Sequence, residues 1–266
     1  MEKHQPNPIT MKKIYFLFFA IIVFCGCHQS KKKQSAANEW MYLFDGSSLD
    51  GWRAYNGEQL PPGWTIIDSV MTFSTEMVLE QDYDYKGSKD IIYAAQEFDN
   101  FELVFEWKIP PGGNSGIFYH VVEGYAGIPV VAPEYQLIDD INYTQYHDIA
   151  DYNRSIGITQ NPEQLQDIQS TAADYGMHTP NAAMKNLHPA GEWNTSKIVF
   201  TPKKVEHWLN GQKVVSFTPW DDAWKAKKNN GKWNLAPDYG MFKKGFIGLQ
   251  DHGSVLWFRN IRIKSL

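Results

Sequence analysis

The residues best suited to chemistry lie near the C-terminus, in the stretch 245–253 (GFIGLQDHG). We expect two strands here, joined by a tight turn at His252-Gly253. Because side chains alternate along a strand, Gly248, Gln250 and His252 share one face, which is too polar for a core and too small for an ordinary surface. Histidine has a free pKa of about 6.5, which suits a general base. We therefore predict a floor for a polar ligand, with His252 as the first candidate for the base.

The neighbouring Asp251 falls on the opposite, buried side of the same strand. A buried carboxylate needs a partner, and either Arg259 or a backbone amide of the turn would supply one. We expect Asp251 to hold the turn at Gly253 and His252 to act chemically.

A second group of polar side chains lies in the strand-like stretch 134–139 (EYQLID). Glu134 and Gln136 share a face, about 6.6–6.8 Å apart along the strand. A retaining glycosidase needs two carboxyl groups about 5–5.5 Å apart, and an inverting one needs about 6.5–9.5 Å. One carboxylate and one amide do not make such a pair, although Asp139 after a bulge would. The pattern disfavours ordinary glycoside hydrolysis and leaves Glu134 as a lone base or a clamp for a sugar hydroxyl.

The stretch 101–109 (FELVFEWKI) alternates aromatic with charged residues. Its aromatic side must face the core, and in most sandwiches the other side is solvated. We accept that interpretation for Glu102 and Lys108. Glu106 lies nearer the following loop and is a candidate for a ligand cleft.

That loop, 111–116 (PGGNSG), is rich in glycine, which allows close approach of a ligand to the backbone. It is not a phosphate loop, since no lysine and no helix follow it. Asn114 and Ser115 are candidates for ligand contact. The residues alone favour a turn in which both side chains bond their own backbone.

Short segments rich in β-branched or aromatic residues recur between Gly, Pro, Asn and Asp, as is typical of a sandwich or jelly roll. Asn210-Gly211 predicts a two-residue hairpin turn. The long polar segments 143–187 and 218–244, with helical hints only at 162–170 and 222–228, are predicted to wall a cleft. The expected strands are 64–67, 70–73, 91–93, 101–109, 116–120, 134–138, 197–201, 204–209, 213–217, 246–249 and 255–264.

Composition fits one large all-β domain over residues 40–266, since such domains reach about 200–250 residues without splitting. Aromatic residues make up 15% of the chain, which suits both sandwich cores and sugar-stacking surfaces. A net charge of −5 argues against a nucleic-acid partner.

Five segments follow one another along the chain: 43–52 (LFDGSSLDGW), 101–117, 133–139 (PEYQLID), 189–194 (PAGEWN) and 245–263. Together they resemble one family, the 3-keto-disaccharide hydrolase domain. The resemblance implies a concanavalin A-like β-sandwich and cleavage of glycosides already oxidised to a ketone at C3. It also favours a ligand role for the 111–116 loop.

A C3 ketone makes the C2 proton acidic, so that the C1 substituent leaves by elimination and water adds afterwards. Such an enzyme needs a base near C2, donors for the enolate oxygen and an acid for the leaving oxygen. We expect His252 as the base and Glu134 as the second choice. The other residues expected to bind substrate are Glu106, Asn114, Ser115, Gln136, Asp139, Lys185, Trp193 and Gln250.

No cofactor is required by this scheme, but a divalent cation would also stabilise an enolate. His120 is a weak candidate ligand, together with Glu134 and His252, although no motif with metal-ligand spacing supports it. The ketone itself must come from a sugar 3-oxidoreductase acting upstream.

A lectin-like carbohydrate-binding module is the alternative, because fold does not determine function. Trp193, Trp220, Trp224 and Trp233 would serve as stacking platforms in either case. Titratable groups at Glu106, Glu134 and His252 favour the enzyme, since a lectin needs no poised base.

The N-terminus predicts a bacterial lipoprotein signal over residues 1–27, with translation starting at Met1 or Met11. Two lysines precede an apolar run of signal-peptide length at 14–24, too short for a membrane span. Cys27 is the expected lipidated residue. A plain cleaved signal and an uncleaved anchor are the alternatives. Residues 28–39 are expected to form a flexible tether, and their lysines favour an outer-membrane anchor facing the periplasm. Both cysteines lie in the signal, so the domain has no disulfide.

Overall fold

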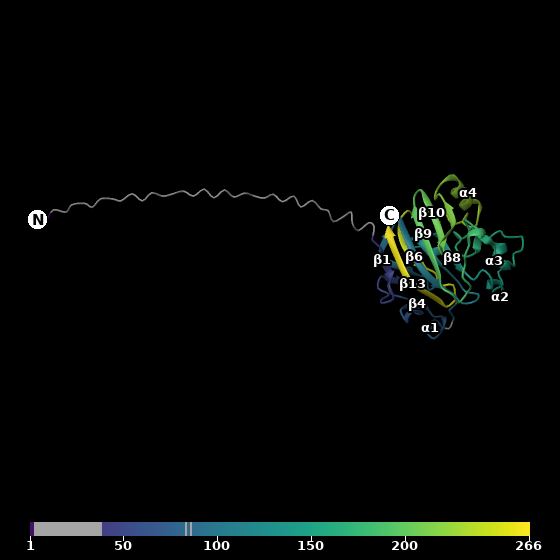
Figure 1. Cartoon of the computed structure of the whole chain (residues 1–266), viewed down its shortest axis with the longest axis horizontal. Coiled ribbons are helices and arrows are strands. Elements are labelled where there is room, and N and C mark those ends of the chain that lie inside the picture. Colours follow the sequence, from purple (N-terminus) through teal and green to yellow (C-terminus); the bar gives the residue numbers. More distant parts are fainter. Residues whose placement is uncertain (3–38, 83, 86) are drawn as a thin grey trace.

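Two antiparallel β-sheets pack face to face from residue 41 onward (Figure 1). The computed structural model describes residues 1–2, 39–82, 84–85 and 87–266. Residues 3–38 of the predicted signal peptide and tether, Cys27 among them, lie outside these described residues. The expected all-β, concanavalin A-like sandwich is confirmed.

The larger sheet has the strand order β11-β10-β9-β6-β13-β4-β3, with β1 paired to β13. The predicted hairpin turn between β10 and β11 is confirmed, because Asn210 and Gly211 both adopt positive φ, 44° and 82°. The strands are β1 (Met41–Phe44), β3 (Trp64–Ile67), β4 (Val70–Phe73), β6 (Phe101–Lys108), β9 (Asn194–Thr201), β10 (Lys204–Leu209), β11 (Gln212–Phe217) and β13 (Leu256–Ser265).

The smaller sheet has the order β2-β5-β12-β7-β8. Residues 172–175 run beside its edge strand, where Gln136 donates its N–H to the carbonyl of Ala173 (3.1 Å) and Tyr175 donates to that of Glu134 (3.0 Å). This pairing covers an edge that would otherwise expose unpaired backbone groups. The strands are β2 (Trp52–Ala54), β5 (Ile91–Phe98), β7 (Asn114–Val121), β8 (Glu134–Ile138) and β12 (Gly245–Leu249).

Burial differs between the two sheets in a way that locates the site. In β6, buried side chains alternate with half-exposed ones, so one face packs on the core and the other meets solvent. In β7 and β8 every residue is buried. The inner face of these strands packs on the core, and their outer face is covered by the long connecting segments.

Helices are few, and they lie outside the sheets. The predicted helix at 222–228 is confirmed as α4, whose first turn is capped by Asp221 accepting from the N–H of Trp224 (2.7 Å). The stretch 162–170 forms only one 3₁₀ turn. No helix among the described residues is long and apolar enough to cross a membrane. The helices are α1 (Thr75–Leu79), α2 (Tyr143–Tyr146), α3 (Ala150–Ser155) and α4 (Asp222–Asn230), with 3₁₀ turns η2 (Ile128–Val130), η3 (Asp167–Gln169) and η4 (Ala182–Met184).

The C-terminal strands depart from expectation. β12 and β13 are not joined by a tight turn, because they belong to different sheets. Residues 250–255 cross from one sheet to the other and form no regular structure. His252 therefore lies in a crossover loop, where strict strand alternation no longer applies.

Candidate active site

A cavity of about 750 Å³ lies over the outer face of β7 and β8, and we call it the cleft. Its floor includes Asn114, Glu134, Gln136 and Ile138, which alternate with the core-facing side chains of the same strands. Binding pockets for small ligands have volumes of about 300–1,000 Å³. The cleft is therefore large enough for a ligand the size of a disaccharide.

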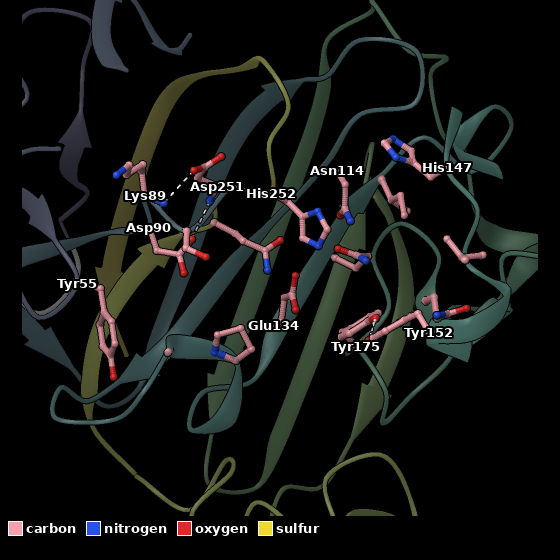
Figure 2. Close-up of a pocket in the computed structure, with 18 of the residues that line it drawn as sticks. Tyr55, Lys89, Asp90, Asn114, Glu134, His147, Tyr152, Tyr175, Asp251 and His252 are labelled. Carbon is pink, nitrogen blue, oxygen red and sulfur yellow. Dashed lines mark hydrogen bonds between the residues drawn. The ribbon is translucent and has the colours of Figure 1, made fainter. Parts of the chain in front are cut away.

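The Glu134 carboxyl group is the central feature of this floor (Figure 2). It lies directly over Gly116, where a Cβ atom would come 2.1 Å from Glu134 Oε1. Glu134 is only 3% exposed, and no hydrogen-bond donor reaches its carboxyl group among the residues that the structure describes. Burial raises the pKa of Glu134, while the Lys232 ammonium opposes that rise. The group is therefore a desolvated carboxyl that faces the ligand space and accepts no hydrogen bond from the described residues.

Two amide side chains beside Glu134 also present free polar atoms. Asn114 Oδ1 and Gln250 Oε1 are buried and accept no hydrogen bond within the described chain. Asn114 donates through Nδ2 to the Tyr143 hydroxyl (3.3 Å), and the Gln250 backbone N–H donates to the Gly116 carbonyl (2.9 Å). Buried polar atoms of native proteins are normally paired, so these oxygens are suited to accept from ligand hydroxyls.

His252 projects into the cleft from the crossover loop (Figure 2). Although His252 is exposed toward the cleft, desolvation by its surroundings lowers its pKa, which favours the neutral imidazole needed by a base. The adjacent Asp251 is 3% exposed and accepts from the Tyr85 hydroxyl, the Lys89 N–H (2.8 Å) and the Gly253 N–H (2.9 Å). The predicted hydrogen bond from a backbone amide of the turn to Asp251 is thus confirmed at Gly253. The alternative prediction, that Arg259 is the partner of Asp251, is wrong.

Asp90 lies at the same end of the cleft as Asp251 and Tyr55 (Figure 2). It accepts the backbone N–H of Asp251 (2.8 Å). Burial, together with the negative charge of Asp251, raises the pKa of Asp90 to about 7. This end of the cleft therefore holds an acid that can carry a proton near neutral pH.

The other end of the cleft is built from Tyr152, Tyr175 and Lys232. Lys232 Nζ donates to the Tyr152 hydroxyl (2.7 Å), and the Tyr152 and Tyr175 hydroxyls are 2.7 Å apart. The ammonium also lies 3.9 Å from the ring centroid of Tyr175 and 4.5 Å from that of Trp233, a cation–π arrangement. Burial lowers the pKa of Lys232, and the Glu134 carboxylate opposes that fall.

The structure brings together five of the predicted site residues in one cleft. They come from β7 and β8 of the smaller sheet and from the crossover loop after β12. The predicted walls are also present: the 143–187 segment contributes several side chains, whereas 218–244 contributes only Lys232. The five residues are Asn114, Glu134, Gln136, Gln250 and His252.

Three predicted site residues lie elsewhere. Glu106 belongs to the larger sheet, where Arg259 Nε (2.7 Å) and an asparagine amide donate to it. Trp193 lies on the outer side of that sheet beneath the Arg259 guanidinium, 4.0 Å from its ring centroid. Ser115 points to the core side of β7 and donates to the Gln250 carbonyl (2.8 Å). Because side chains alternate along β7, Ser115 points to the face opposite that of Asn114. Glu106 and Trp193 lie outside the cleft because they lie in or beside the larger sheet, and the sequence does not show which sheet a strand joins.

Asp139 and Lys185 are occupied by structural bonds outside the cleft. Asp139 accepts from the N–H of Gly112 (2.9 Å) and from the side chain of Asn142 (2.8 Å), and so fixes the turn after β8. Lys185 forms an ion pair with Asp140 and donates to a serine hydroxyl. Neither residue lines the cleft, so the structure does not bring them together with the other predicted site residues.

The structure does not support His120 as a candidate metal ligand together with Glu134 and His252. His120 is 2% exposed, and its ring nitrogens lie 3.1 Å and 2.8 Å from the carbonyl oxygens of Phe242 and Asp99. It does not line the cleft with Glu134 and His252. In the described part of the chain, no three His, Cys, Asp or Glu side chains are arranged to hold a metal ion.

Sequence patterns did not single out Asp90, Tyr152, Tyr175 or Lys232. The two tyrosines lie in the segment predicted to wall the cleft, and Lys232 precedes a tryptophan in the other such segment. Asp90 immediately precedes β5. The only local indication of a functional role was that these residues lie near strand ends or in long loops. Many surface residues lie in such positions, so the indication is not specific.

Comparisons with known proteins agree with this geometry. The family model described as a 3-keto-alpha-glucoside-1,2-lyase-like domain matches residues 39–264. A 3-keto-disaccharide hydrolase from Bacteroides thetaiotaomicron is 36% identical over 251 residues, covering 86% of this chain and 79% of that protein. A crystal structure of a candidate glycosyl hydrolase from Parabacteroides distasonis is 37% identical with a TM-score of 0.72, covering 85% of this chain and 94% of that one. The crystal structure of a second candidate glycosyl hydrolase from that species is 25% identical with a TM-score of 0.59, and the match covers 86% of this chain and 100% of that one.

Proposed function

The chain belongs to the 3-keto-alpha-glucoside-1,2-lyase-like domain family, and from this premise we propose that it cleaves glycosides whose sugar ring carries a ketone at C3. The observation that carries the proposal is the desolvated carboxyl group of Glu134, which faces the cleft from its floor beside a histidine. The floor strand carries no second carboxylate at the spacing that ordinary glycosidases use. An activated substrate removes the need for such a pair.

The reaction begins with removal of the C2 proton, which the ketone acidifies by delocalising the resulting charge as an enolate. The C1 substituent then leaves, and water adds to the double bond, so the net result is hydrolysis. His252 takes the C2 proton as a neutral imidazole. General base catalysis of this kind contributes about 10²–10⁴-fold.

Glu134 binds a sugar hydroxyl from the floor of the cleft and is the second candidate for the base. Burial raises its pKa, so it can hold a proton and act as a donor, as protonated carboxyls do in other enolising sites. The Nε2 group of Gln136 and the Nδ2 group of Asn114 are further donors for O3. Stabilisation of the enolate oxygen by such donors is worth about 10²–10³-fold.

The positions of the four candidate tryptophans do not favour the alternative, a lectin-like module that would stack sugars on their rings. Trp224 and Trp233 are buried, at 3% and 5% exposure. Trp193 is covered by Arg259, and Trp220 packs on Phe200 while donating to the Gly240 carbonyl (2.7 Å). None of these four rings lines the cleft as a stacking platform, whereas titratable groups do.

The test compares a 3-keto-glucoside with its unoxidised parent under identical conditions. We expect release of the aglycone from the ketone and little from the parent. Equal rates on both would contradict elimination and favour an ordinary glycosidase. Binding of both without cleavage of either would favour the lectin-like module. The ketone must be supplied by a sugar 3-oxidoreductase, which we place upstream of this protein.

A further inference from the structure

We propose that Tyr152, supported by Lys232, is the acid that protonates the leaving oxygen. This role rests on the proposed elimination, in which the C1–O bond breaks with an unstable alkoxide as its product unless a proton is delivered. Tyr152 lines the cleft and is 42% exposed. Its hydroxyl is therefore both fixed by protein contacts and open to the ligand space.

Hydrogen bonding leaves the Tyr152 proton free for the substrate. The ammonium of Lys232 can only donate, so the Tyr152 oxygen accepts at 2.7 Å. Tyr175, 2.7 Å away on the other side, can donate to the same oxygen. With both as donors, the Tyr152 O–H has no acceptor in the pair and can point into the cleft.

Burial raises the pKa of Tyr152, so the phenol keeps its proton until the leaving oxygen needs it. A cation beside a phenol stabilises the phenolate that remains after proton transfer. The Lys232 ammonium is held against the rings of Tyr175 and Trp233, at 3.9 Å and 4.5 Å from their centroids. Because burial lowers the pKa of Lys232, the ammonium can also pass a proton to the phenolate. Tyr152 is then the catalytic residue. Lys232 is a positioning residue, which holds the Tyr152 hydroxyl and returns a proton to it.

The acid and the base lie on different sides of the Glu134 carboxyl group. In Figure 2, the His252 ring lies above the Glu134 carboxyl group, and the Tyr175–Tyr152 pair lies to its right. His252 comes from the crossover loop and Tyr152 from α3. A sugar ring lying over Glu134 would therefore meet the base at one side and the acid at the other.

The proton balance closes over the two half-reactions. His252 takes the C2 proton, and the C–H electron pair forms the enolate with the C3 ketone. The enolate then collapses to a C1–C2 double bond while the C1–O bond breaks. The leaving oxygen keeps that electron pair and takes the Tyr152 proton, which Lys232 replaces. Addition of water to C1 returns the His252 proton to C2 and gives one water proton to the Lys232–Tyr152 pair.

The dependence on the leaving group tests this assignment. A 3-keto-glucoside of 4-nitrophenol needs little protonation of its leaving oxygen, whereas the methyl 3-keto-glucoside needs it fully. We expect Tyr152→Phe to keep the nitrophenyl rate within about threefold and to lose about 10²–10⁴-fold on the methyl glycoside. Lys232→Met should show the same selective loss, and Lys232→Arg should restore part of it, because it keeps the cation.

Tyr146→Phe is the matched control, since Tyr146 is 63% exposed and does not line the cleft. It should behave as the unchanged protein on both substrates. Equal losses of Tyr152→Phe on the two substrates, or no loss on either, would overturn the assignment of the acid. If the unchanged protein cleaves neither ketone, the proposed function itself is refuted, and the acid assignment falls with it.

Discussion

At the scale of single residues, the site depends on a glycine placed against a carboxyl group. Gly116 faces Gln136 across the β7–β8 pair, and the Glu134 side chain occupies the space that a Cβ would fill. The Glu134 carboxyl group is thereby held over the strand, and no hydrogen bond from the described part of the chain reaches it. Shape, rather than bonding, keeps the carboxyl group available to a ligand.

Gly116→Ala should therefore move the Glu134 carboxyl group. The added Cβ would lie 2.1 Å from Oε1 and 2.7 Å from Cδ and Cγ, an overlap that typically costs about 1–3 kcal/mol. We expect a lower free energy of unfolding by denaturant and a loss of kcat/KM on the keto-glycoside. Gly127→Ala is the control for stability, because its Cβ would meet only a proline atom at 3.6 Å. Unchanged activity in Gly116→Ala would show that the position of Glu134 does not matter.

Substitution of His252 should affect catalysis, whereas substitution of the adjacent Asp251 should affect stability. His252→Ala should lower kcat on a keto-glycoside by about 10²–10⁴-fold with an unchanged melting temperature. Asp251→Ala removes an acceptor of several hydrogen bonds, and each bond to a charged group is worth about 1.5–3 kcal/mol. It should mainly lower stability. Near-normal kcat in His252→Ala would transfer the role of base to Glu134.

Asp90 should make stability depend on pH. Burial raises the pKa of its carboxyl group from 3.8 to about 7, so between these values the folded protein holds a proton that the unfolded chain has lost. Stability due to this group therefore falls as pH rises through that window and is constant above it. We expect the unfolding free energy of the unchanged protein, relative to Asp90→Asn, to decline from about pH 4 to about pH 7. Parallel pH profiles for the two proteins would contradict the shifted pKa.

At the scale of elements, the wall of the cleft is tied together by a buried asparagine. Asn153 of α3 is fully buried; its Nδ2 donates to the carbonyl of Pro162 (2.7 Å), and its Oδ1 accepts from Gln169 (2.8 Å). These bonds join α3 to the loop that follows it. They hold Tyr152, the preceding residue, at the edge of the cleft.

Asn153→Ala should loosen this wall while leaving the sheets intact. Unpaired buried groups cost about 1–3 kcal/mol, and here the cost is local to residues 143–170. We expect faster hydrogen exchange in that segment and a lower kcat/KM, with exchange in β6 unchanged as the internal control. Uniformly faster exchange through β6 would show instead that Asn153 supports the whole fold.

At the scale of the whole molecule, the lipid anchor remains a proposal that the N-terminal sequence supports. We propose that Cys27 is lipidated and that the domain faces the periplasm from the outer membrane. Expression of the full chain in a Gram-negative host should place it in the membrane fraction, and Cys27→Ser should release it or leave its precursor unprocessed. Cys25→Ser is the matched control and should remain with the membrane. Release of both variants, or of neither, would contradict lipidation at Cys27.

The sequence by itself indicated most of the strands and the chemistry that each of them carries, but it did not predict β1 and β2. Alternation with a period of two is a local property, so it correctly placed Glu134 and Gln136 on one face and the Asn210-Gly211 turn between β10 and β11. The order of the motifs also indicated the family, which the comparisons confirm. These inferences need no knowledge of which strands are neighbours.

Only the tertiary structure decided which of these residues meet. Glu106 has the right chemistry but lies in the larger sheet, and β12 and β13 separate into different sheets although they are adjacent in sequence. Asp90, Tyr152 and Lys232 come from distant segments and converge over β7 and β8. Sheet membership and loop packing depend on long-range burial of apolar surface rather than on local pattern. The polar residues of the cleft floor could therefore be predicted from single strands. The residues at the two ends of the cleft, Asp90 at one and Tyr152 and Lys232 at the other, could be identified only from the tertiary structure.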